Sequence, residues 1–580
     1  MKRILLPISV MIGLAFAKSD LVQSSFGDLR CQGCRTVVQA LSDRLTTDPF
    51  VSAINVLIGD KYDALSIAQS LSQLIITPDY FCSKVTNLCE GKAQYQEVDP
   101  QDDIHNILKD KPNHISNNFI NELYEELGNR RYIAAPKRLK FLHISDLHLD
   151  LFYEEGTISD CGQSYCCRND TYIGQGSNKA GKFGAVVGNC DPPKVTLQDA
   201  LNFIKEKINP DVIVWTGDNS PHDGYRTSEW EVTLNTNVTT QMIQQTFPHL
   251  LNATYAVFGN HDNFPNNNWN FKTGSPAAQN SMSMWKPWID PEKFEQFQKT
   301  GYYSQRLKNI NYKLVQVIAL NTQSCDINNR FVMSELYDPN NQIEWLINEL
   351  KLVEQNDGVA IIVQHIIPEE CSESYAVRYR AVLERFQHII RLNFFGHTHA
   401  DKFKVSRAYD DQNSPISMLH VCGSISTWGG NPSFCVYEVD EDTMLPVSRQ
   451  TYAFDMAKAN QDGFITWDLY TDWLITYELK DLSPNSFVEF ANKVKQDGLL
   501  ARQYNQRARR DYNLSGFCDD NCRQNAYCEM MTQSLEEMSQ CQGKSFPYDM
   551  GGDIVNGILQ YLQNPWVKVQ DKKEKLHKWN

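Results

Sequence analysis

The chain has 580 residues, 42% of them apolar, and its 70 acidic residues against 55 basic ones give a net charge of −15. This size and apolar content support a large buried core divided over two or three folding units, as in a soluble globular protein. The negative charge argues against nucleic acid as a partner. It suits an acidic vesicle lumen, where partial protonation of carboxylates reduces their mutual repulsion.

The first residues have the layout of a secretory signal. A basic start at residues 1–3 precedes an apolar stretch over residues 4–16, which ends in the small-x-small pattern of residues 15–17. Because a membrane-spanning helix needs roughly twenty apolar residues, we interpret residues 1–17 as a removable signal peptide. No later segment is apolar enough to cross a bilayer, and the Lys- and Glu-rich end is unlike a lipid-anchor signal, so we expect the mature chain to be soluble.

The number of cysteines and the glycosylation sequons also indicate passage through the secretory pathway. The 16 cysteines, an even number, fit an oxidising compartment in which most or all are paired. Sequons for N-glycosylation occur at Asn169, Asn237, Asn252 and Asn513. We therefore expect a protein of the secretory pathway that is secreted, lysosomal or both.

Two pairs of cysteines enclose a helical pattern near the N-terminus. Cys31 and Cys34 open this segment, Cys82 and Cys89 close it, and the simplest pairing is Cys31–Cys89 with Cys34–Cys82. Apolar residues recur between them at helical spacing, namely Val37, Val38, Leu41, Leu45, Val56, Leu57, Leu65, Ala68, Leu71, Leu74 and Ile75. Over residues 27–93 the segment resembles an all-α saposin B-type domain, whose amphipathic helices open to receive lipid. That family normally has a further cysteine pair, which is missing here, and an ordinary helical bundle is the alternative.

A polar and charged segment follows over residues 94–137, with prolines on both sides of a predicted helix, Phe119–Leu127. We interpret it as a linker that packs on both of its neighbours. No internal repeat or long low-complexity tract occurs in the sequence.

Five short apolar runs, rich in β-branched and aromatic side chains, are predicted to be buried strands. They are Leu139–Ser145, Val212–Thr216, Thr254–Phe258, Val359–Val363 and Leu392–Phe395. A segment with oxygen or imidazole donors follows each run directly: Asp146-Leu147-His148, Gly217-Asp218-Asn219, Gly259-Asn260-His261-Asp262, Gln364-His365 and Gly396-His397-Thr398-His399. Because ligands gather at the carboxyl ends of strands in α/β sheets, we expect one shared site.

The donor segments together predict a binuclear metal centre. Two divalent ions that share one carboxylate need about seven or eight protein groups and a bridging water. An Asp-x-His pair at a strand end projects both donors to one face. The glycines before Asp218, Asn260 and His397 let the chain turn sharply close to the metals. Each segment by itself is compatible with an ordinary turn or a satisfied polar residue, but the ordered set is not.

In this order the motifs D-x-H, GD, GNH[DE], H and GHxH resemble the calcineurin-like metallophosphoesterase superfamily. The resemblance implies that residues 138–450 form an α/β domain, a β-sandwich flanked by helices. It also implies the ligands, which are Asp146, His148, Asp218 and His399 for one ion, and Asp218 as a bridge with Asn260, His365 and His397 for the other. Imidazole-rich ligation and a secretory setting favour Zn²⁺ for both ions, although iron or manganese fit the same donors.

Two further histidines are candidates for catalysis. His222 lies four residues beyond Asp218 and can reach over the metals as a proton donor, although an exposed loop histidine is the alternative. Many members of the superfamily have no histidine at that place. His261 follows Asn260 and, by the resemblance, contacts a phosphoryl oxygen or the leaving group.

The remaining cysteines are expected to staple loops. Local pairs Cys161–Cys166 and Cys167–Cys190 are plausible in a Gly- and Asn-rich insertion that is too long to hold its shape without bridges. Cys325 and Cys371 would tie together the loops after two strands near the site. Cys422 and Cys435 flank a hairpin-like stretch, Gly423–Phe434, and are either paired across it or buried as thiols.

Residues 451–580 are predicted to be a helical extension, with Phe487, Phe490, Ala491 and Val494 at helical spacing. Four cysteines staple it, and the resemblance to acid sphingomyelinases, which carry such an extension at this place, implies the pairs Cys518–Cys522 and Cys528–Cys541. Saposin-like domain, metallophosphoesterase domain and helical extension occur here in the order of that family.

The resemblance implies hydrolysis of sphingomyelin to ceramide and phosphocholine at acidic pH. A metal-bridging hydroxide would attack phosphorus, and His222 or His261 would protonate the leaving alcohol. The chain would reach membrane lipid through the saposin-like domain, as a monomer in peripheral contact with the membrane. An aromatic pocket should hold the choline headgroup, and Trp428, Tyr153 and Trp269 are candidates for it.

Three alternatives remain. One is a phosphodiesterase that acts on soluble nucleotide or CDP-alcohol diesters. Another is a lipid-binding or transfer protein with a vestigial metal site, although no expected ligand is missing. A purple acid phosphatase is disfavoured, because no tyrosine replaces a ligand and Leu147 occupies the middle of the first motif.

Overall fold

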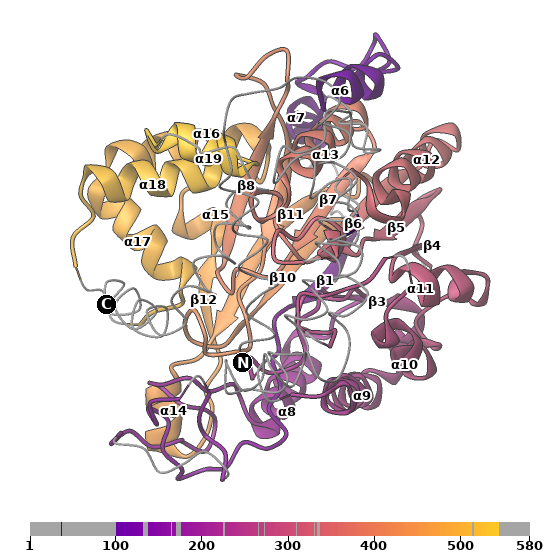
Figure 1. The fold of residues 1–580 in the computed structure, drawn as a ribbon. Coiled ribbons are helices and arrows are strands. Elements are labelled where there is room, and N and C mark those ends of the chain that lie inside the picture. Colours follow the sequence, from indigo (N-terminus) through magenta and orange to yellow (C-terminus); the bar gives the residue numbers. More distant parts are fainter. Residues whose placement is uncertain are drawn as a thin grey trace, which may run out of the picture. The chain divides into compact units, whose positions relative to one another are not determined.

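A computed structural model of the chain (Figure 1) describes Thr36 and residues 100–544, apart from residues 131–136, 164, 170–175, 224–226, 265, 272, 309, 330, 333–336 and 513–515. The chain divides into two compact units, and residues 100–544 lie within one of them, Val98–Phe546. The predicted signal peptide (residues 1–17) and saposin-like domain (residues 27–93), with its two expected disulfides, therefore remain predictions outside the described unit.

Two six-stranded sheets form the centre of this unit. The first contains, in spatial order, β12 (Asp468–Asp472), β11 (Pro446–Ala453), β10 (Ser433–Asp440), β1 (Arg138–Ile144), β2 (Val212–Trp215) and β3 (Thr254–Ala256). The second contains β4 (Tyr303–Arg306), β5 (Val315–Ala319), β6 (Val359–Val363), β7 (Ile390–Phe395), β9 (Pro415–Val421) and β8 (Lys402–Arg407). Strands β1 to β3 are parallel, as are β5, β6, β7 and β9, so their carboxyl ends face the same way within each sheet.

The two sheets share one core, into which the second sheet directs alternate side chains. Phe141 and Ile213 of the first sheet share one core with Ile361 and Phe394 of the second. The intervening residue of β6, Ile362, points instead into the core beneath the helices on the outer face. This period of two is the signature of strands that are buried on both faces, and it establishes a mixed α/β fold.

Helices cover the outer faces of both sheets (Figure 1). The longer ones are α6 (Pro100–Leu108), α7 (Phe119–Arg130), α8 (Lys194–Phe203), α9 (Glu229–Thr246), α10 (Pro276–Trp285), α11 (Phe294–Thr300), α12 (Gln342–Gln355), α13 (Glu373–Arg385), α14 (Met456–Asp462), α16 (Pro484–Gln496), α17 (Gly498–Ala508), α18 (Asp520–Met531) and α19 (Leu535–Cys541). Short turns are η2 (Ile204–Ile208), η3 (Pro248–Ala253), η4 (Pro291–Lys293), η5 (Thr322–Ser324), η7 (Pro339–Asn341), η8 (Pro368–Glu370) and α15 (Trp473–Thr476). None of these described helices is both long and apolar enough to span a bilayer.

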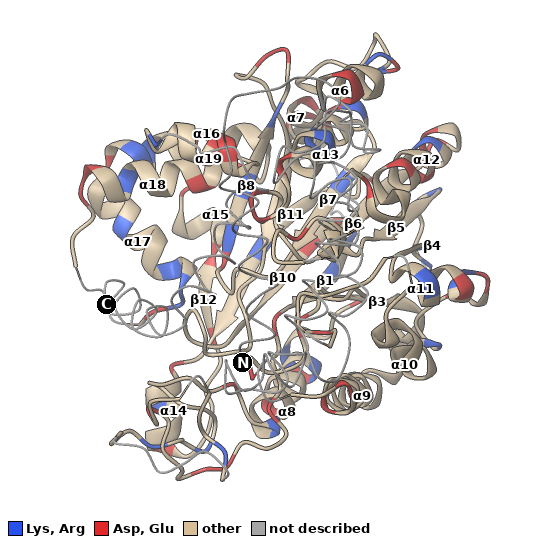
Figure 2. Ribbon diagram, viewed as in Figure 1, with Lys and Arg blue, Asp and Glu red and all other residues tan. Residues whose placement is uncertain are grey.

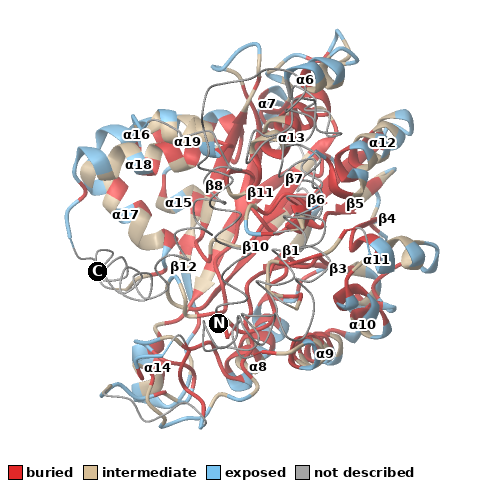
Figure 3. Cartoon of the chain, in the orientation of Figure 1, coloured by how far each residue is buried: buried red, intermediate tan, exposed pale blue. Residues whose placement is uncertain are grey.

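Burial follows this layering. Figure 3 shows buried residues concentrated in the strands and exposed ones on the outer turns of the helices. Figure 2 shows Lys and Arg interspersed with Asp and Glu on outer helices such as α11, α12 and α18.

The predicted strands and helices are confirmed. All five apolar runs form strands, β1, β2, β3, β6 and β7, and β6 has the predicted bounds. The predicted linker helix is α7, and α16 buries Phe487, Phe490, Ala491 and Val494 as its spacing indicates.

One local prediction is wrong. The stretch Gly423–Phe434 is not a hairpin, because β9 pairs with β7 and β8 whereas β10 pairs with β1 and β11. The chain crosses from one sheet to the other, and the disulfide Cys422–Cys435 joins the two sheets. The other expected pairs also form, namely Cys161–Cys166, Cys167–Cys190, Cys325–Cys371, Cys518–Cys522 and Cys528–Cys541, and no cysteine in the described part of the chain is free.

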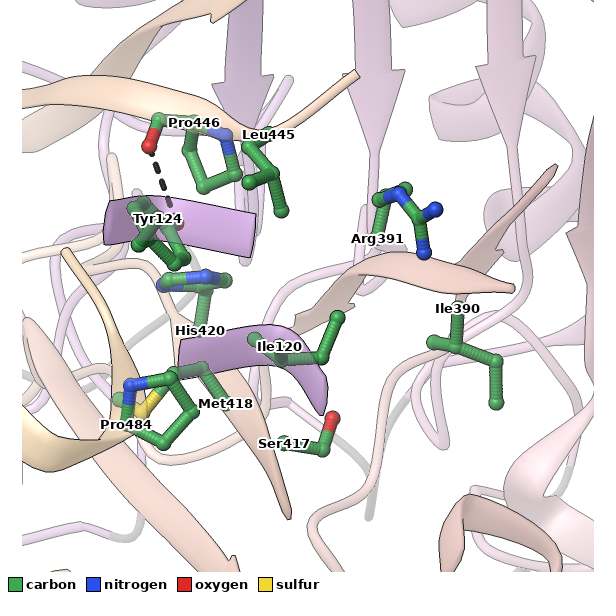
Figure 4. A pocket seen from close by; sticks show the side chains of 10 residues that line it. All are labelled: Ile120, Tyr124, Ile390, Arg391, Ser417, Met418, His420, Leu445, Pro446 and Pro484. Atoms are coloured by element: carbon green, nitrogen blue, oxygen red, sulfur yellow. Dashed lines mark hydrogen bonds between the residues drawn. The ribbon is translucent and has the colours of Figure 1, made fainter. Parts of the chain in front are cut away.

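The linker packs on the domain that follows it. The Tyr124 hydroxyl of α7 donates to the carbonyl oxygen of Pro446 at 3.0 Å, and the Asn121 amide donates to that of Pro415 at 3.1 Å. Figure 4 shows the small hollow between α7 and the sheet, lined by Ile120, Tyr124, Ile390, Arg391, Ser417, Met418, His420, Leu445, Pro446 and Pro484. The neighbour before the linker lies outside the described residues.

Candidate metal centre

The loops at the carboxyl ends of the parallel strands bring four buried donors together. Asp146, His148, Asp218 and His399 each present a ligand atom within 4.8 Å of the others. His148 Nε2 lies 3.1 Å from His399 Nε2 and 3.5 Å from Asp218 Oδ2, and His399 Nε2 lies 3.4 Å from Asp146 Oδ1. These are the residues expected at the first ion.

A second set of donors adjoins the first. His365 Nε2 lies 3.2 Å from Asp218 Oδ2 and 3.1 Å from Asn260 Oδ1, and His397 Nδ1 lies 3.3 Å from His365 Nε2. Asp218 Oδ2 is therefore the atom common to both sets, which is the position expected of a bridging carboxylate.

The protonation pattern of the imidazoles fits metal ligation. The Nδ1 atoms of His148, His365 and His399 lie 2.6–2.7 Å from the carbonyl oxygens of Ser220, Thr216 and Trp428, to which they must donate. In the neutral rings each Nε2 then carries a lone pair, and these lone pairs point at one another and at carboxylate and amide oxygens. A cation between such atoms converts their repulsion into ligation, so the buried His and Asp cluster fits a metal site.

The backbone at the donors is strained. Asp146, His148, Asp218, His397 and His399 all have positive φ, between 41° and 71°. Left-handed backbone at a residue other than glycine costs on the order of 1–3 kcal/mol, and such strain clusters at functional sites.

Glycines let the loops approach closely. A Cβ on Gly217, which has φ of 91°, would lie 2.4 Å from the amide nitrogen of Gly259. A Cβ on Gly259 would lie 2.2 Å from Asp218 Oδ1, and one on Gly396 would lie 2.0 Å from Ser145 Oγ. The expected role of these glycines is confirmed, although at Gly259 and Gly396 the reason is close packing rather than a positive φ.

A carboxylate outside the donor set fastens two of the loops. Asp262 accepts hydrogen bonds of 2.8 Å from the backbone N–H groups of Asp218, Asn219 and Gly259. The loops after β2 and β3 are thereby held at the spacing that the bridge requires. Burial raises the pKa of Asp262 to about 7.

The two metal-facing carboxylates differ in their electrostatics. Burial raises the pKa of Asp146 to about 6. At Asp218 burial acts in the same direction, but the imidazoles of His365 and His261 outweigh it and hold the pKa of that carboxyl well below its usual range. Asp218 is therefore ionised across the physiological pH range, as a bridging ligand must be.

His222 and His261 lie beside the donors without belonging to the two sets above. The His222 ring stacks between His148, with ring centroids 3.8 Å apart, and Trp428, at 4.2 Å and an interplanar angle of 2°. Its Nδ1 lies 2.9 Å from Oδ1 of the buried Asp191. The His261 ring lies 4.7 Å from that of His222.

His261 is held differently from His222. Its backbone N–H donates to Asp218 Oδ1 at 2.7 Å, and its Nδ1 lies 2.9 Å from the amide nitrogen of Asn266. Burial lowers the pKa of its imidazole to about 4. His222 therefore has an anionic partner, whereas His261 has a neutral one.

Sequence reasoning missed two acidic residues that contact the site. Asp191 directly follows Cys190 and also accepts a hydrogen bond of 2.8 Å from the Ser426 hydroxyl. Glu370 directly precedes Cys371, and its Oε2 lies 2.9 Å from His397 Nε2. In both cases the neighbouring cysteine was the only feature of the sequence that drew attention to the position, and it indicated a disulfide rather than a functional site.

The aromatic candidates for a headgroup pocket differ in how far they are buried. Trp428 is partly buried beside His222, and its indole N–H donates to the carbonyl oxygen of Cys190 at 3.0 Å. Tyr153 is also partly buried, with its hydroxyl on the carbonyl oxygen of Gly181. Trp269 is fully buried in the core beside Phe258, so its assignment to an open pocket is wrong.

Comparison with known proteins places two family regions on the chain. The model of the calcineurin-like phosphoesterases matches residues 139–401, which contain every donor named above. The model of the acid sphingomyelin phosphodiesterase C-terminal region matches residues 416–545. The first match ends directly before β8 and the second begins at the start of β9, so residues 402–415 lie between them.

Individual relatives are similar over most of the chain. Sphingomyelin phosphodiesterase B of Dictyostelium discoideum is 29% identical over 423 residues, which are 70% of this chain and 65% of that protein. Human sphingomyelin phosphodiesterase is 25% identical over 415 residues, again 70% of this chain and 65% of that protein. Human cyclic GMP-AMP phosphodiesterase SMPDL3A is 28% identical over 424 residues, 69% of this chain and 89% of that protein. The chain thus covers slightly less than two thirds of the length of these two sphingomyelin phosphodiesterases.

Proposed function

We propose that this chain, which belongs to the calcineurin-like phosphoesterases and carries the C-terminal region of the acid sphingomyelin phosphodiesterases, is a phosphoric diester hydrolase that cleaves sphingomyelin to ceramide and phosphocholine. The observation that carries the proposal is the shared carboxylate. Asp218 Oδ2 lies 3.5 Å from His148 Nε2 of one donor set and 3.2 Å from His365 Nε2 of the other.

In this proposal the two donor sets hold two divalent ions. Asp146, His148, Asp218 and His399 hold one ion, and Asp218, Asn260, His365 and His397 hold the other. Zn²⁺ is the ion that so many imidazoles favour. When bound, the ions polarise the phosphoryl oxygens and supply an activated water as nucleophile.

The leaving alcohol needs a proton, and His222 is placed to give it. Ceramide is a poor leaving group as an alkoxide, so protonation by a general acid accelerates its departure. Asp191 fixes His222 through Nδ1, which leaves Nε2 as the atom that can carry the transferred proton. When the ring is protonated, Asp191 forms an ion pair with it. Stacking on Trp428 fixes the plane of the ring.

His261 has the complementary role. Its partner Asn266 is neutral, and its backbone N–H is anchored on the bridging carboxylate of Asp218. We assign it to contact with a phosphoryl oxygen. A general acid must carry its proton before the reaction, and low pH favours the protonated imidazole, so we expect an acidic optimum and a loss of activity at alkaline pH.

The substrate is proposed from the relatives and from the predicted N-terminal segment. Proteins named sphingomyelin phosphodiesterase match the chain, and a saposin-like segment over residues 27–93 would present a membrane lipid to the site. Soluble nucleotide diesters are the second candidate, because a relative named cyclic GMP-AMP phosphodiesterase matches over 89% of its own length.

The proposed setting is the secretory pathway, with a secreted or lysosomal destination. Six disulfides in the described unit fit an oxidising compartment. The sequon residues Asn169 and Asn252 are exposed and open to glycosylation. Peripheral contact with a membrane surface and a monomeric state complete the proposal.

Release of phosphocholine from sphingomyelin liposomes at roughly pH 5, where an imidazole donor is charged, tests the function. The full chain should release phosphocholine, and chelator or Asp218→Asn should abolish the release. A matched assay with a soluble nucleotide diester distinguishes the two candidate functions. A nucleotide phosphodiesterase would hydrolyse that diester faster than it hydrolyses sphingomyelin. Extraction of lipid without turnover after addition of metal would point to a lipid-transfer protein instead.

A further inference from the structure

One imidazole of the donor set is oriented opposite to the other three. His148, His365 and His399 direct Nε2 at the site and donate Nδ1–H to a backbone carbonyl. His397 directs Nδ1 at the site, at 3.3 Å from His365 Nε2, and its Nε2 faces the carboxylate of Glu370 at 2.9 Å. Three ligands therefore have a neutral partner behind them, and the fourth has an anion.

The two donor sets also differ in charge. The first contains two carboxylates, Asp146 and Asp218, whereas the second has only the shared Asp218 and the neutral amide of Asn260 among its oxygen donors. A dication in the second set would therefore be compensated by less negative charge. The carboxylate of Glu370, one imidazole away from the ion, restores that balance.

The protein fixes Glu370 in this position. Its backbone lies at the end of the short turn η8, and its N–H donates to the carbonyl oxygen of Ile367 at 3.0 Å. The next residue, Cys371, is bonded to Cys325, and the N–H of Ser372 donates to the carbonyl oxygen of Cys325 at 2.8 Å. This disulfide and these backbone hydrogen bonds tie together the loops after β5 and β6 and fix the backbone of Glu370, while its side chain is partly exposed and contacts His397.

We propose that Glu370 is a positioning residue for the second ion, which orients His397 through Nε2 and supplies the negative charge that Asn260 does not. The inference rests on the proposed assignment of two ions. An imidazole that donates to a carboxylate is a stronger and better oriented ligand than one with a neutral partner. The affinity of one ion, and not of both, should therefore depend on Glu370.

Titration of the metal-free full chain with Zn²⁺, by calorimetry or competition with a chromophoric chelator, tests the inference. The wild-type chain should bind two Zn²⁺ ions. In Glu370→Gln, which keeps the shape and removes the charge, one ion should bind about 10–100-fold more weakly and the other should be unchanged. The affinity of Glu370→Asp for that ion should lie between those of the wild type and Glu370→Gln. Its shorter side chain keeps the charge but places it farther from His397.

The matched control is Glu344→Gln, because Glu344 is an exposed residue on α12. This variant should bind both ions as the wild type does. Two wild-type sites with no change in Glu370→Gln would overturn this inference and leave the two-ion assignment standing. Equal weakening of both ions would also overturn it, because a general structural role would then be sufficient. Fewer than two ions on the wild-type chain would overturn the two-ion assignment and the inference together.

Discussion

At the scale of single residues, the donors are held in place against their own conformational preference. Asp146, His148, Asp218, His397 and His399 share left-handed backbone conformations that cost free energy in the folded state. Hydrogen bonds from neighbouring loops hold them there, such as the two that Asp262 accepts from Asp218 and Asn219. The protein's own loops therefore fix the positions of the donors.

The assignment of His222 as general acid predicts a dependence on the leaving group. His222→Ala should lower kcat for sphingomyelin by about 10²–10⁴-fold, because the ceramide alkoxide then leaves unprotonated. With p-nitrophenyl phosphocholine, whose leaving group needs no proton, the loss should be far smaller. Initial rates on both substrates measure the difference.

Asp191→Asn serves as the companion variant. It keeps the hydrogen bond to His222 Nδ1 but removes the charge. Its kcat should therefore fall less than that of His222→Ala, and the fall should again be larger for sphingomyelin than for p-nitrophenyl phosphocholine. Equal losses on both substrates in either variant would show that His222 acts in binding or folding rather than in proton transfer.

His388, outside the site, predicts a pH dependence of stability. Burial lowers the pKa of His388 to about 4, with Arg385 and Arg391 acting in the same direction, although Glu354 offsets part of the shift. An ordinary imidazole in the unfolded chain titrates near pH 6.5. Between about pH 6.5 and 4 the unfolded state binds a proton that the folded state excludes, so the free energy of unfolding falls as the pH drops.

The size of this effect is roughly 2 kcal/mol, after allowance for solvent screening at a partly buried position. His388→Gln should remove it, so the difference in unfolding free energy between pH 7 and pH 4.5 should shrink. Urea denaturation of both proteins at the two pH values measures the difference. An unchanged pH slope in the variant would show that His388 titrates normally in the folded state.

The residues that sequence reasoning could find are those whose position follows from strand geometry. Asp146 and His148 come directly after an apolar run, and the face that they share follows from the strand period. Asp191 follows no such run, and Glu370 lies five residues beyond His365, too far from the end of its strand for the strand period to place it. Their roles depend on tertiary contacts that no local pattern encodes.

At the scale of secondary-structure elements, a buried ion pair connects the two sheets. Arg449 of β11 is fully buried and donates through Nη2 to Asp401 Oδ1 at 2.6 Å and to the carbonyl oxygen of Val421 at 2.8 Å. Val421 ends β9, and Asp401 directly precedes β8. Nη2 also donates to the carbonyl oxygen of Lys402 at 2.9 Å, so one side chain of the first sheet satisfies three acceptors in or next to the second.

Arg449→Met should destabilise the protein by about 3–5 kcal/mol, because it leaves Asp401 buried without its counter-ion. Replacement of both partners, in Arg449→Met with Asp401→Leu, should recover much of that loss. The exposed pair Lys308 and Asp290 provides the control, and Lys308→Met should cost less than about 1 kcal/mol. Chemical denaturation measures all four proteins, and similar losses for Arg449→Met and Lys308→Met would contradict the prediction.

The failed hairpin prediction belongs to the same scale. Glycine-rich connections between two apolar runs are typical of hairpins, and Gly429 and Gly430 both have the left-handed backbone that such turns use. Here the same residues let the connection pass close to the site, since a Cβ on Gly429 would lie 2.9 Å from the Cβ of His399. Whether adjacent strands pair or separate into two sheets depends on the partners that each strand finds elsewhere.

At the scale of the whole molecule, the C-terminal region contributes to the metal centre. Arg510 is fully buried, and its Nη1 donates to the carbonyl oxygen of His399 at 2.6 Å. The N–H of Asp401, two residues beyond His399, donates to the carbonyl oxygen of Ala508 at 2.8 Å. A Cβ on Gly430 would lie 1.6 Å from the carbonyl oxygen of Arg509, so the two segments are in close contact.

Arg510→Met should therefore impair both stability and the site. It leaves the carbonyl oxygen of His399 without its charged donor, which should cost about 2–4 kcal/mol of folding free energy. Phosphocholine release should fall together with the Zn²⁺ content of the purified protein. Full metal content and full activity in a destabilised variant would show that the C-terminal region only supports the fold.

Metal analysis of the active full chain tests most directly whether two ions share Asp218. Bound metal per chain, measured while a chelator is titrated in, should begin at two ions, and phosphocholine release should decline as the ions are removed and return when Zn²⁺ is restored. Asp218→Asn should hold fewer ions and release no phosphocholine at any metal concentration. Undiminished phosphocholine release from a chain stripped of metal, or from Asp218→Asn, would contradict the shared-carboxylate centre.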